Sequence, residues 1–580
     1  MPLPVAIARY VRPRMHLHFA SSPSRSNAAV RALAHAFRRL DPEFVFSATG
    51  FHSTMHLLPI LRLGKRYISC FFGDNYPTPR PNPIYGRLEA EGVELEHWSL
   101  WSYTSALRAG ALGQTYAVTN SLSGTTLGEE LAIKGKFTEV VDPVRPDRNI
   151  ALVAAIRPSV AFVHAAAGDR EGNVLASPPY SEGYWGALAA ECGVIVTVDQ
   201  LVDRAVLRGR PDWLKLPPYR VLAICEEPFG AHPQPSYFAA LAPEVMSYSD
   251  DFEHYEIWRR MTTDAKLFAS FSRHVLEVED PSSGYREFVG RRRLEALRSM
   301  VGRRSSVFPR AGQVAGEDSA SSVSLSSADQ MVILAARTIA RRAIAGGYRA
   351  ILAGIGTSFA AARLAKLLLK AQGLALEVMV ETGMSDIECG PTGHPFLLAS
   401  SNMAQAARLS SIEDVLGTLT CGAHNRCIGV LGAAEIDTAG NINSTRLASG
   451  QLLVGSGGAN DIASSCREVV AVVRCDPSRL VDRVHYVTSP GKSVLHIATE
   501  RCVLSRGSAT DIWSIGDVCP GAASLTEALG SIRENCRFSQ VDTHGASWAE
   551  PPSRFERQML AAIRAADAPA VDARVAGAEG

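Results

Sequence analysis

The sequence has almost no excess charge of either sign. Its 59 lysines and arginines are balanced by 58 aspartates and glutamates, which leaves a formal net charge of +1 at pH 7. Proteins whose main partner is nucleic acid or an anionic membrane usually carry a strongly basic face. The chain also lacks an apolar run long enough to cross a bilayer, and its N-terminus lacks the pattern of a signal peptide. We therefore expect a cytoplasmic protein with no nucleic acid and no membrane among its partners.

The sequence patterns of common metal and nucleotide sites are missing as well. The eleven cysteines include no C-x-x-C pair, and the spacing from Cys421 to Cys427 is not that of a zinc site. No Walker A loop, H-E-x-x-H motif or G-x-S-x-G motif occurs. We therefore predict reduced thiols and no metal site, and we set aside P-loop ATPases, zinc peptidases and serine hydrolases as first interpretations.

What the sequence does contain is a repeated alternation of strand and helix patterns. At 580 residues the chain is long enough for two to four domains. Alternating β-rich and helical segments favour an α/β fold with open, mostly parallel sheets. We predict two related α/β domains in tandem, at 1–255 and 329–538. A helical segment and flexible linker is expected at 256–328, and an irregular tail at 539–580.

A weak internal repeat supports this division. The first half contains "VAFVHAAAGDREGNVLAS" and the second contains "IGVLGAAEIDTAGNINST". In each, an apolar strand is followed by a D-x-x-G-N turn, at Asp169–Asn173 and at Asp437–Asn441. Aspartate and asparagine bond to nearby backbone amides, and glycine supplies the positive φ of such turns. We infer that the two domains are related and face each other across a shared site.

The stretch "VMVETGMSD" places a carboxylate, Glu381, directly after a short apolar run. Val378–Val380 read as a buried strand, so Glu381 falls at a carboxyl end, where open α/β sheets bind their ligands. Gly383 allows a sharp turn and a close approach of a ligand. Such a carboxylate can act as a nucleophile towards an activated acyl group, although a solvated glutamate at a strand end remains the simpler interpretation.

Two glycine-rich segments and one histidine complete the candidate site. "GIGTSFAA", with Gly354 and Gly356, lies between a strand and a helix, but the third glycine of a dinucleotide-binding motif is missing. "VGSGGANDIA" leaves the backbone at Gly455–Gly458 free of bulky side chains, so that its amides can converge on an anion, and Asn460 or Asp461 can cap the following helix. His232, in "FGAHP", is a candidate acid, base or carboxylate ligand, and equally a structural residue.

Taken together, these motifs resemble family I coenzyme A transferases, in particular the glutaconate CoA-transferase branch. The family has α and β subunits of similar fold (NagB/RpiA-like), and this chain looks like both subunits joined head to tail. The segments that carry the resemblance are "DREGN", "VIVTVDQLVD" and "EEPFGAHPQPSY" in the first half, and "AGIGTSFAAARLAK", "ETG", "GAAEIDTAGNINST", "GSGGANDIA", "VHYVTSPG" and "ATERCVL" in the second. One departure is "HFASSPSRSNAAV", which has no glycine where the α subunit usually has a glycine-rich loop.

The resemblance implies a ping-pong transfer of CoA between two carboxylic acids. Glu381 would attack an acyl-CoA and become a glutamyl-CoA thioester, with the amides of Gly457 and Gly458 holding the oxyanion. CoA is then a substrate, and no tightly bound cofactor is expected. The implied contacts to CoA or substrate are Gly354, Gly356, Gly383, Gly455, Asn460 and His232. The partners are an acyl-CoA and a carboxylic acid, and we expect a homodimer or higher homo-oligomer.

Three other functions stay open at this point. On the same fold, water in place of an acid would give an acyl-CoA hydrolase that cleaves a thioester or opens a ring at a carbon–carbon bond. Transfer to the phosphopantetheine arm of a carrier protein uses the same thiol chemistry. A silent subunit that only binds acyl-CoA would account for the altered loop near Ser21, Ser22 and Ser26.

Overall fold

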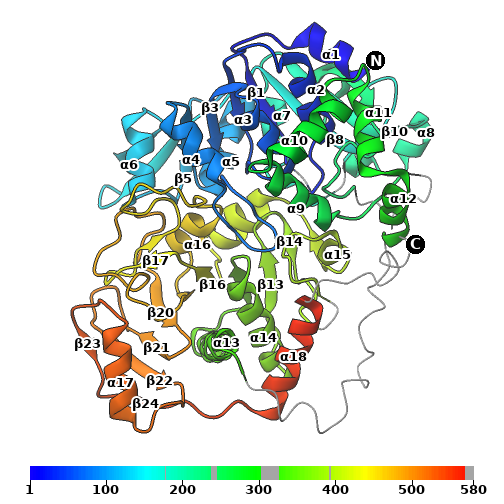
Figure 1. The fold of residues 1–580 in the computed structure, drawn as a ribbon. Helices are drawn as coiled ribbons and strands as arrows, with labels where there is room; N and C mark the ends of the chain where they lie inside the picture. Colours follow the sequence, from blue (N-terminus) through cyan, green and yellow to red (C-terminus); the bar gives the residue numbers. More distant parts are fainter. Residues whose placement is uncertain (22, 177, 237–244, 302–324, 391–392, 568–580) are drawn as a thin grey trace.

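The structure is a computed structural model, and it describes residues 1–567 except 22, 177, 237–244, 302–324 and 391–392. Residues 302–324 of the expected linker and 568–580 of the expected tail therefore lie outside the described residues. Two α/β units are stacked on each other: the first half of the chain forms the upper unit of Figure 1 and the second half the lower one.

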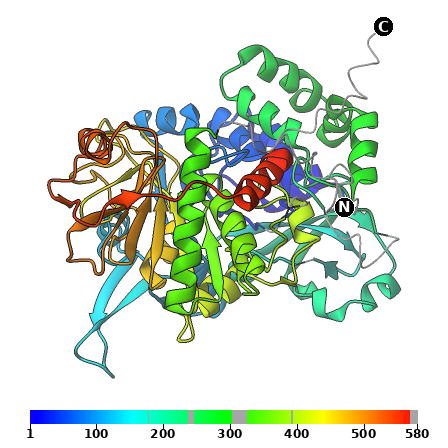
Figure 2. The same cartoon turned by 90° about the horizontal axis from the view of Figure 1, so that it is seen from below.

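The first unit is built on a parallel sheet. Its strand order is β11 (Val221–Glu226), β10 (Gly193–Leu201), β8 (Val160–Gly168), β1 (His16–Phe19), β2 (Phe44–Ser47), β3 (Gly64–Ser69) and β4 (Glu94–His97), with β9 (Val174–Leu175) antiparallel to β8. The helices of this unit are α1 (Leu3–Tyr10), α2 (Asn27–Phe37), α3 (Leu57–Ile60), α4 (Pro83–Ala90), α5 (Leu100–Ala111), α7 (Trp185–Ala189) and α8 (Arg204–Arg208). A separate antiparallel sheet of β5 (Tyr116–Thr119), β7 (Asn149–Ala154) and β6 (Phe137–Val141), with α6 (Thr126–Ile133), projects from the side of the molecule (Figure 2).

The second unit is built on a mixed sheet. Its order is β15 (Arg408–Leu409), β14 (Met384–Ser385), β13 (Glu377–Val380), β12 (Ala350–Ala353), β16 (Cys427–Gly432), β19 (Val469–Val472), β20 (Val494–Ala498), β21 (Cys502–Ser505), β22 (Trp513–Val518) and β23 (Val541–Asp542). The strands from β13 to β20 are parallel, β24 (Ser547–Trp548) also pairs with β22, and β17 (Glu435–Ile436) and β18 (Ile442–Asn443) form a hairpin. The helices are α13 (Ser327–Gly346), α14 (Thr357–Ala371), α15 (Ser400–Met403), α16 (Ala459–Ser465), α17 (Leu525–Glu534) and α18 (Arg554–Asp567).

The two sheets share one strand order, as the internal repeat predicts. The neighbouring strands of the first sheet are β11, β10, β8, β1 and β2, and those of the second are β20, β19, β16, β12 and β13. In both runs the fourth strand comes first along the chain, followed by the fifth, the third, the second and the first. Both D-x-x-G-N turns close in the same way, because the backbone amide of Asn173 donates to Asp169 Oδ1 (3.0 Å) and that of Asn441 donates to Asp437 Oδ1 (2.9 Å). The fold class of two related, mostly parallel-sheet domains is therefore confirmed.

Further helices follow each of the two units. Four helices, α9 (Phe252–Met261), α10 (Ala265–Phe271), α11 (Pro281–Val289) and α12 (Arg291–Met300), follow the first unit, and α11 packs on α2. The expected irregular tail holds α18, which packs on α14 and is anchored by the ion pair of Glu556 with Arg337 (2.6 Å). No helix in the described part of the chain combines the length and the apolar character needed to span a membrane.

The two units share an apolar core. One cluster of buried side chains contains Trp98, Trp101 and Leu122 of the first half together with Ile412 and Ile462 of the second. We call the contact between the two units the seam. Burial of apolar surface across the seam favours a fixed arrangement of the units. A site that uses residues of both halves is therefore held in one geometry.

Candidate active site

Glu381 lies where the sequence places it, directly after the last residue of β13. Its partner strand β12 is parallel, so the loop that follows β12 emerges at the same edge of the sheet. The chain turns sharply at Gly383, whose φ is +115°, and a Cβ there would lie 2.5 Å from the carbonyl oxygen of Ser410. Only glycine fits this turn, which brings the Glu381 side chain to the seam between the two units.

The glycine-rich run crosses this seam. The amide of Phe72 donates to the carbonyl of Val454 (2.8 Å), and the amide of Leu100 donates to the carbonyl of Gly457 (2.9 Å). At Gly455, with φ +101°, a Cβ would lie 2.7 Å from the carbonyl oxygen of Cys70. The absence of side chains thus lets two backbones from different halves approach each other closely.

Gly458 is the member of this run that faces the Glu381 carboxylate. A Cβ at this position would lie 2.1 Å from Glu381 Oε2, and the nearby backbone amide lowers the pKa of the carboxylate. The Gly457 amide is engaged elsewhere, because it donates to the Cys70 carbonyl at 2.9 Å. The predicted pair of amide donors is therefore reduced to one, the amide of Gly458.

The electrostatics of the site favour a proton on Glu381. Burial and, to a smaller extent, the neighbouring Asp461 raise the pKa of Glu381 to about 7, although the backbone amide of Gly458 acts in the opposite direction. Asp461 is itself fully buried, and burial raises its pKa to about 6. A glutamate that titrates near neutral pH beside a second carboxylate is typical of active sites.

The sequence suggested that Asn460 or Asp461 caps the following helix, but neither side chain does so. The N-cap of α16 is Gly458, with no side-chain cap. Asp461 instead accepts from the hydroxyls of Ser99 (2.6 Å) and Ser121 (2.5 Å) across the seam. Asn460 is fully buried and also bridges the halves, since its Oδ1 accepts from the Leu122 amide (2.9 Å). Both side chains therefore lock the seam behind Glu381.

The loop with Gly354 and Gly356 lies at the same edge of the sheet as Glu381. The amide of Gly354 donates to the carbonyl of Val430 (2.9 Å). Gly356 has φ +91° and forms the N-cap of α14, and a Cβ there would lie 3.4 Å from Thr78 of the first half. This loop is a close turn between strand and helix.

His232 lies in a fully buried polar cluster of the first half. Its Nδ1 is 2.8 Å from the Tyr285 hydroxyl and its Nε2 is 3.0 Å from Asp251 Oδ2. Asp251, His232 and His254 are close enough to hold a metal ion, but Arg293 donates to both oxygens of Asp251. Because a guanidinium already neutralises this carboxylate, the cluster is better explained as a buried structural network, and a role of His232 in substrate binding stays a prediction.

A small cavity between the units lies beside Glu381, and sequence reasoning did not find it. Its volume is about 90 Å³, and its lining comes from both halves, including Ser21, Arg25, Thr49, His52, Thr382 and Met384. The glycine-free loop "HFASSPSRSNAAV" was the one available signal, because it contains the cavity residues Ser21 and Arg25. Thr382, the residue after Glu381, lines this cavity, whereas Glu381 itself is not among its lining residues.

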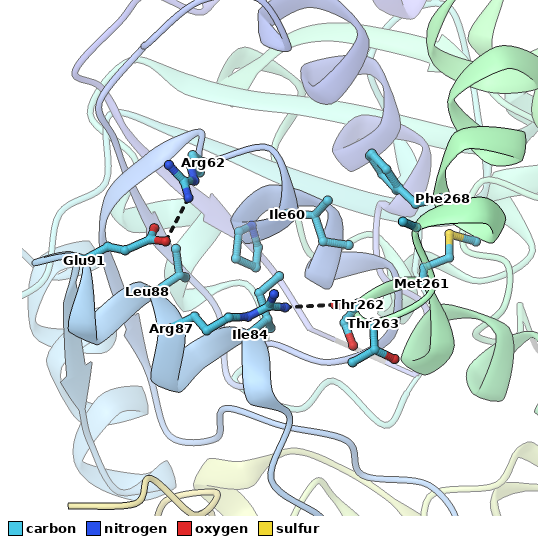
Figure 3. Close-up of a pocket in the computed structure, with 12 residues that line it drawn as sticks. Ile60, Arg62, Ile84, Arg87, Leu88, Glu91, Met261, Thr262, Thr263 and Phe268 are labelled. Atoms are coloured by element: carbon cyan, nitrogen blue, oxygen red, sulfur yellow. Dashed lines mark hydrogen bonds and ion pairs between the residues drawn. The ribbon is translucent and has the colours of Figure 1, made fainter.

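A larger hollow lies on the outer surface of the first unit. Figure 3 shows Ile60, Ile84 and Met261 around it, with the ion pair of Arg62 and Glu91 at one side. Its lining belongs entirely to residues 59–268, which exclude Glu381 and the glycine-rich run. The smaller cavity at the seam is the one of these two whose lining includes residues of both halves, among them Thr382 beside Glu381.

A sequence model of the coenzyme A transferase family matches residues 2–226. The first part of the chain is therefore similar to the coenzyme A transferase family. The chain is 28% identical to one subunit of 3-oxoadipate CoA-transferase from Pseudomonas knackmussii over 179 residues, which are 31% of this chain and 58% of that subunit. It is 25% identical to the other subunit of the enzyme from the same organism over 261 residues, which are 42% of this chain and 94% of that subunit.

The fold likeness extends over nearly the whole chain. The crystal structure of an acyl-CoA transferase from E. coli O157:H7, in a thioester complex with CoA, superposes with a TM-score of 0.64 at 15% sequence identity. The match covers 96% of this chain and 95% of that chain. Together with the matches to both subunits of the 3-oxoadipate enzyme, this supports the arrangement of two family halves fused in one chain.

Proposed function

We propose that this protein transfers CoA from an acyl-CoA to a carboxylic acid, with Glu381 as the nucleophile. The observation that carries the proposal is the placement of the Glu381 carboxylate at the seam, with the Gly458 amide aimed at it. The similarity of residues 2–226 to the coenzyme A transferase family supports the same chemistry. CoA is a substrate in this proposal, and the two acids are its acyl donor and acceptor.

The reaction proceeds through acyl exchange on Glu381. The carboxylate attacks the thioester carbonyl of the donor, the carbon–sulfur bond breaks, and CoA thiolate leaves an acyl-glutamyl anhydride. The thiolate then attacks the glutamyl carbonyl, which forms a glutamyl-CoA thioester and releases the first acid as its carboxylate. A second carboxylate attacks this thioester, and the same two steps in reverse release the new acyl-CoA and regenerate Glu381.

Gly458 has a specific role in these steps. When the thiolate attacks the glutamyl carbonyl, negative charge develops on an oxygen that belonged to Glu381 itself. The Gly458 amide lies close to this carboxylate and lowers its pKa, so it is positioned to stabilise that oxyanion. Because the amide belongs to a backbone locked across the seam, it needs no reorganisation during the reaction.

The remaining predicted contacts divide by position. Gly354, Gly356, Gly383 and Gly455 leave the edge of the sheet around Glu381 free of side chains, which suits the approach of the CoA pantetheine arm. Asn460 holds the two halves together through its hydrogen bond with the Leu122 amide. His232 belongs to the buried network with Tyr285 and Asp251. A homo-oligomer and a cytoplasmic location stay predictions.

The test is to mix the protein with an acyl-CoA and a second, isotopically labelled acid, and to quantify labelled acyl-CoA and free CoA. The proposal predicts labelled acyl-CoA in amounts equal to the donor consumed, with little free CoA. Free CoA released without labelled product would contradict the proposal and indicate hydrolysis instead. The assay is run with a panel of carboxylic acids.

A further inference from the structure

Exposed apolar side chains gather on the small antiparallel sheet of the first unit. Six of the large apolar side chains that are exposed in the described part of the chain lie in residues 116–144: Tyr116, Val118, Ile133, Val140, Val141 and Val144. This sheet projects from the body of the molecule, as the cyan strands of Figure 2 show. Antiparallel sheets normally turn polar side chains to the water, so an exposed apolar surface of this kind needs an explanation.

One face of this sheet is built from cross-strand neighbours that carry no charge. Val118 of β5 lies opposite Leu152 of β7, and Leu152 lies opposite Thr138 of β6. On the same face, Ile150 of β7 lies opposite Val140 of β6. Alternate residues of β5 and β7 point the other way and are buried. We call the face with Val118, Leu152, Ile150 and Val140 the uncovered face.

Strand β6 also has an open edge. Consecutive residues of an antiparallel strand direct their N–H and C=O groups to opposite sides. The amide of Asp142 donates to the Arg148 carbonyl (2.9 Å), so the even-numbered residues of this strand face β7. Phe137, Glu139 and Val141 therefore direct their backbone groups away from the sheet. Within the described residues, these backbone groups have no hydrogen-bond partner.

This edge lacks most of the features that usually protect an edge strand. Proteins protect such edges with lysine, proline, bulges or a covering segment. Strand β6 contains neither lysine nor proline, and its register with β7 runs without a shift from Phe137 to Val141. The residues after Phe137 are all exposed, and Glu139 is the single charge among them. A regular, exposed edge of this kind is a template for a further strand.

The charges around this edge favour a second copy of the chain as the partner. The segment 136–148 carries three basic and three acidic side chains, which cancel: Lys136, Arg145 and Arg148 against Glu139, Asp142 and Asp147. The segment therefore selects neither an acidic nor a basic partner. The whole chain has a formal net charge of +1, so two copies do not repel each other strongly. Because the sheet projects from the body (Figure 2), two copies can meet at their β6 edges before their bodies touch.

We propose that β6 pairs with β6 of a second copy of this chain, antiparallel about a twofold axis at Val140, so that the two small sheets become one continuous sheet. The open backbone groups of Glu139 then bond to those of Val141 in the second copy, and the reverse. On the uncovered face, Val140 lies opposite Val140 of the second copy, which extends the apolar row that begins at Ile150. Such an interface combines main-chain hydrogen bonds with burial of apolar side chains.

Side-chain matching selects this register over its neighbours. Opposite residues of an antiparallel pair share a face, so a twofold axis must pass between two copies of the same residue. An axis at Glu139 would place two carboxylates opposite each other, which is unfavourable. An axis at Thr138 would place Val140 opposite the charged Lys136. The axis at Val140 avoids both and pairs apolar side chains on the uncovered face.

Cysteine crosslinking tests the register. At the proposed axis the two Val140 positions form a pair without mutual backbone hydrogen bonds, with Cα atoms about 4.5 Å apart, which a disulfide can bridge. With oxygen and copper phenanthroline as oxidant, Val140→Cys should give a reducible dimer in denaturing electrophoresis. Thr138→Cys, on the same face of the same strand, is the matched control and should stay uncrosslinked, because the two Thr138 positions lie several residues apart. Both variants also carry Cys192→Ser, because Cys192 is exposed.

Sedimentation of the full chain tests whether this edge holds copies together without a covalent link. The wild type should sediment as two copies or a multiple of two. Val140→Lys places two ammonium groups opposite each other at the axis, so the dissociation constant should rise by about tenfold or more. Val5→Lys, the same change at an exposed valine of α1, should leave it unchanged. Both lysine variants should unfold cooperatively, because both side chains are exposed in the single chain.

Each outcome upholds or overturns the pairing at β6. A Val140→Cys dimer together with weaker association of Val140→Lys would uphold it. A wild type that sediments as a single copy at every concentration, or an unchanged dissociation constant in Val140→Lys, would overturn it. Crosslinking of Thr138→Cys without crosslinking of Val140→Cys would overturn the axis at Val140. These measurements follow association and not turnover, so they stand or fall independently of the proposed CoA transfer.

Discussion

The two halves of the chain share a scaffold and differ at one position after equivalent strands. Strand β2 is followed by Ala48-Thr49-Gly50, and strand β13 by Glu381-Thr382-Gly383. Both threonines line the seam cavity. The first half thus keeps the turn but has a fully buried alanine in place of the carboxylate. A duplicated fold has therefore placed the nucleophile candidate in one half only.

The loops after the first strand of each sheet differ in the complementary way. After β12 the second half has the glycine turn at Gly354–Gly356, whereas after β1 the first half has "ASSPSRSN" with Arg25. In the proposed function the second half supplies the reacting group and a backbone with few side chains, while Arg25 of the first half lines the nearby cavity. The comparison shows that the candidate site takes residues from both related units, so that neither half contains all of its residues.

The largest effect should come from removing the carboxylate that distinguishes the halves. Glu381→Ala should lower the rate of CoA transfer by roughly 10⁴-fold or more, because no other group can form the thioester. Glu377→Ala, in the same strand but ion-paired with Arg408 at the surface, is the matched control and should remain active. Transfer rates under saturating substrates give the comparison, and a Glu381→Ala protein with normal turnover would show that the two halves do not differ in this function.

A somewhat smaller effect is expected at the backbone donor. In Gly458→Ala the new Cβ would collide with Glu381 Oε2, which displaces the carboxylate from the amide. We expect kcat to fall by about 10²–10³-fold, as for loss of an oxyanion contact, with KM for CoA esters changed less. Gly530→Ala, in α17 with open space around its Cβ position, should behave as the wild type in the same kinetic measurement. A change confined to KM would assign Gly458 to binding rather than chemistry.

The pH dependence tests the electrostatics of the second half. The nucleophile is the deprotonated form of Glu381, whose pKa is raised to about 7, so kcat/KM should fall about tenfold per pH unit below pH 7. Asp461→Asn removes a negative neighbour and should move this limb to lower pH, while its amide can still bond to Ser99 and Ser121. A rate profile that stays flat from pH 8 to pH 5, or an unmoved limb in Asp461→Asn, would contradict this account.

The smallest effect sharpens the structural side of the comparison. Gly172 and Gly440 occupy the same place in the two D-x-x-G-N turns and both have positive φ, so an alanine at either costs about 1–2 kcal/mol. At Gly440 a Cβ would also lie 2.6 Å from Arg506 Nη2, whereas at Gly172 the nearest atom is 3.4 Å away. Gly440→Ala should therefore lower the unfolding free energy more than Gly172→Ala in chemical denaturation. The reverse order would mean that the turns are not packed as described.

The parts of the site that depend on local pattern could be predicted from the sequence. The apolar run before Glu381, the turn at Gly383 and the helix that ends at Gly346, capped by Gly347 with φ +63°, all follow from short-range preferences. The seam could not be predicted in the same way. The Gly457 amide donates to the Cys70 carbonyl, and Asp461 accepts from the hydroxyls of Ser99 and Ser121. These partners lie more than 300 residues away in the chain. Arg25 was not predicted, because the lack of hydrogen-bond partners for its Nε and Nη1 among the described residues is seen only in the folded chain.

The central claim is that CoA becomes covalently attached to Glu381, and intact mass spectrometry tests it most directly. The protein is incubated with an acyl-CoA in the absence of a second acid, and a parallel sample is treated with borohydride, which reduces a glutamyl thioester to an alcohol. The account predicts a protein mass increased by CoA less one water, and a reduced side chain that peptide mapping places at Glu381 and that is missing in Glu381→Ala. An adduct mapped to any other residue, or turnover of acyl-CoA with acid and no adduct or reduced glutamate, would contradict it.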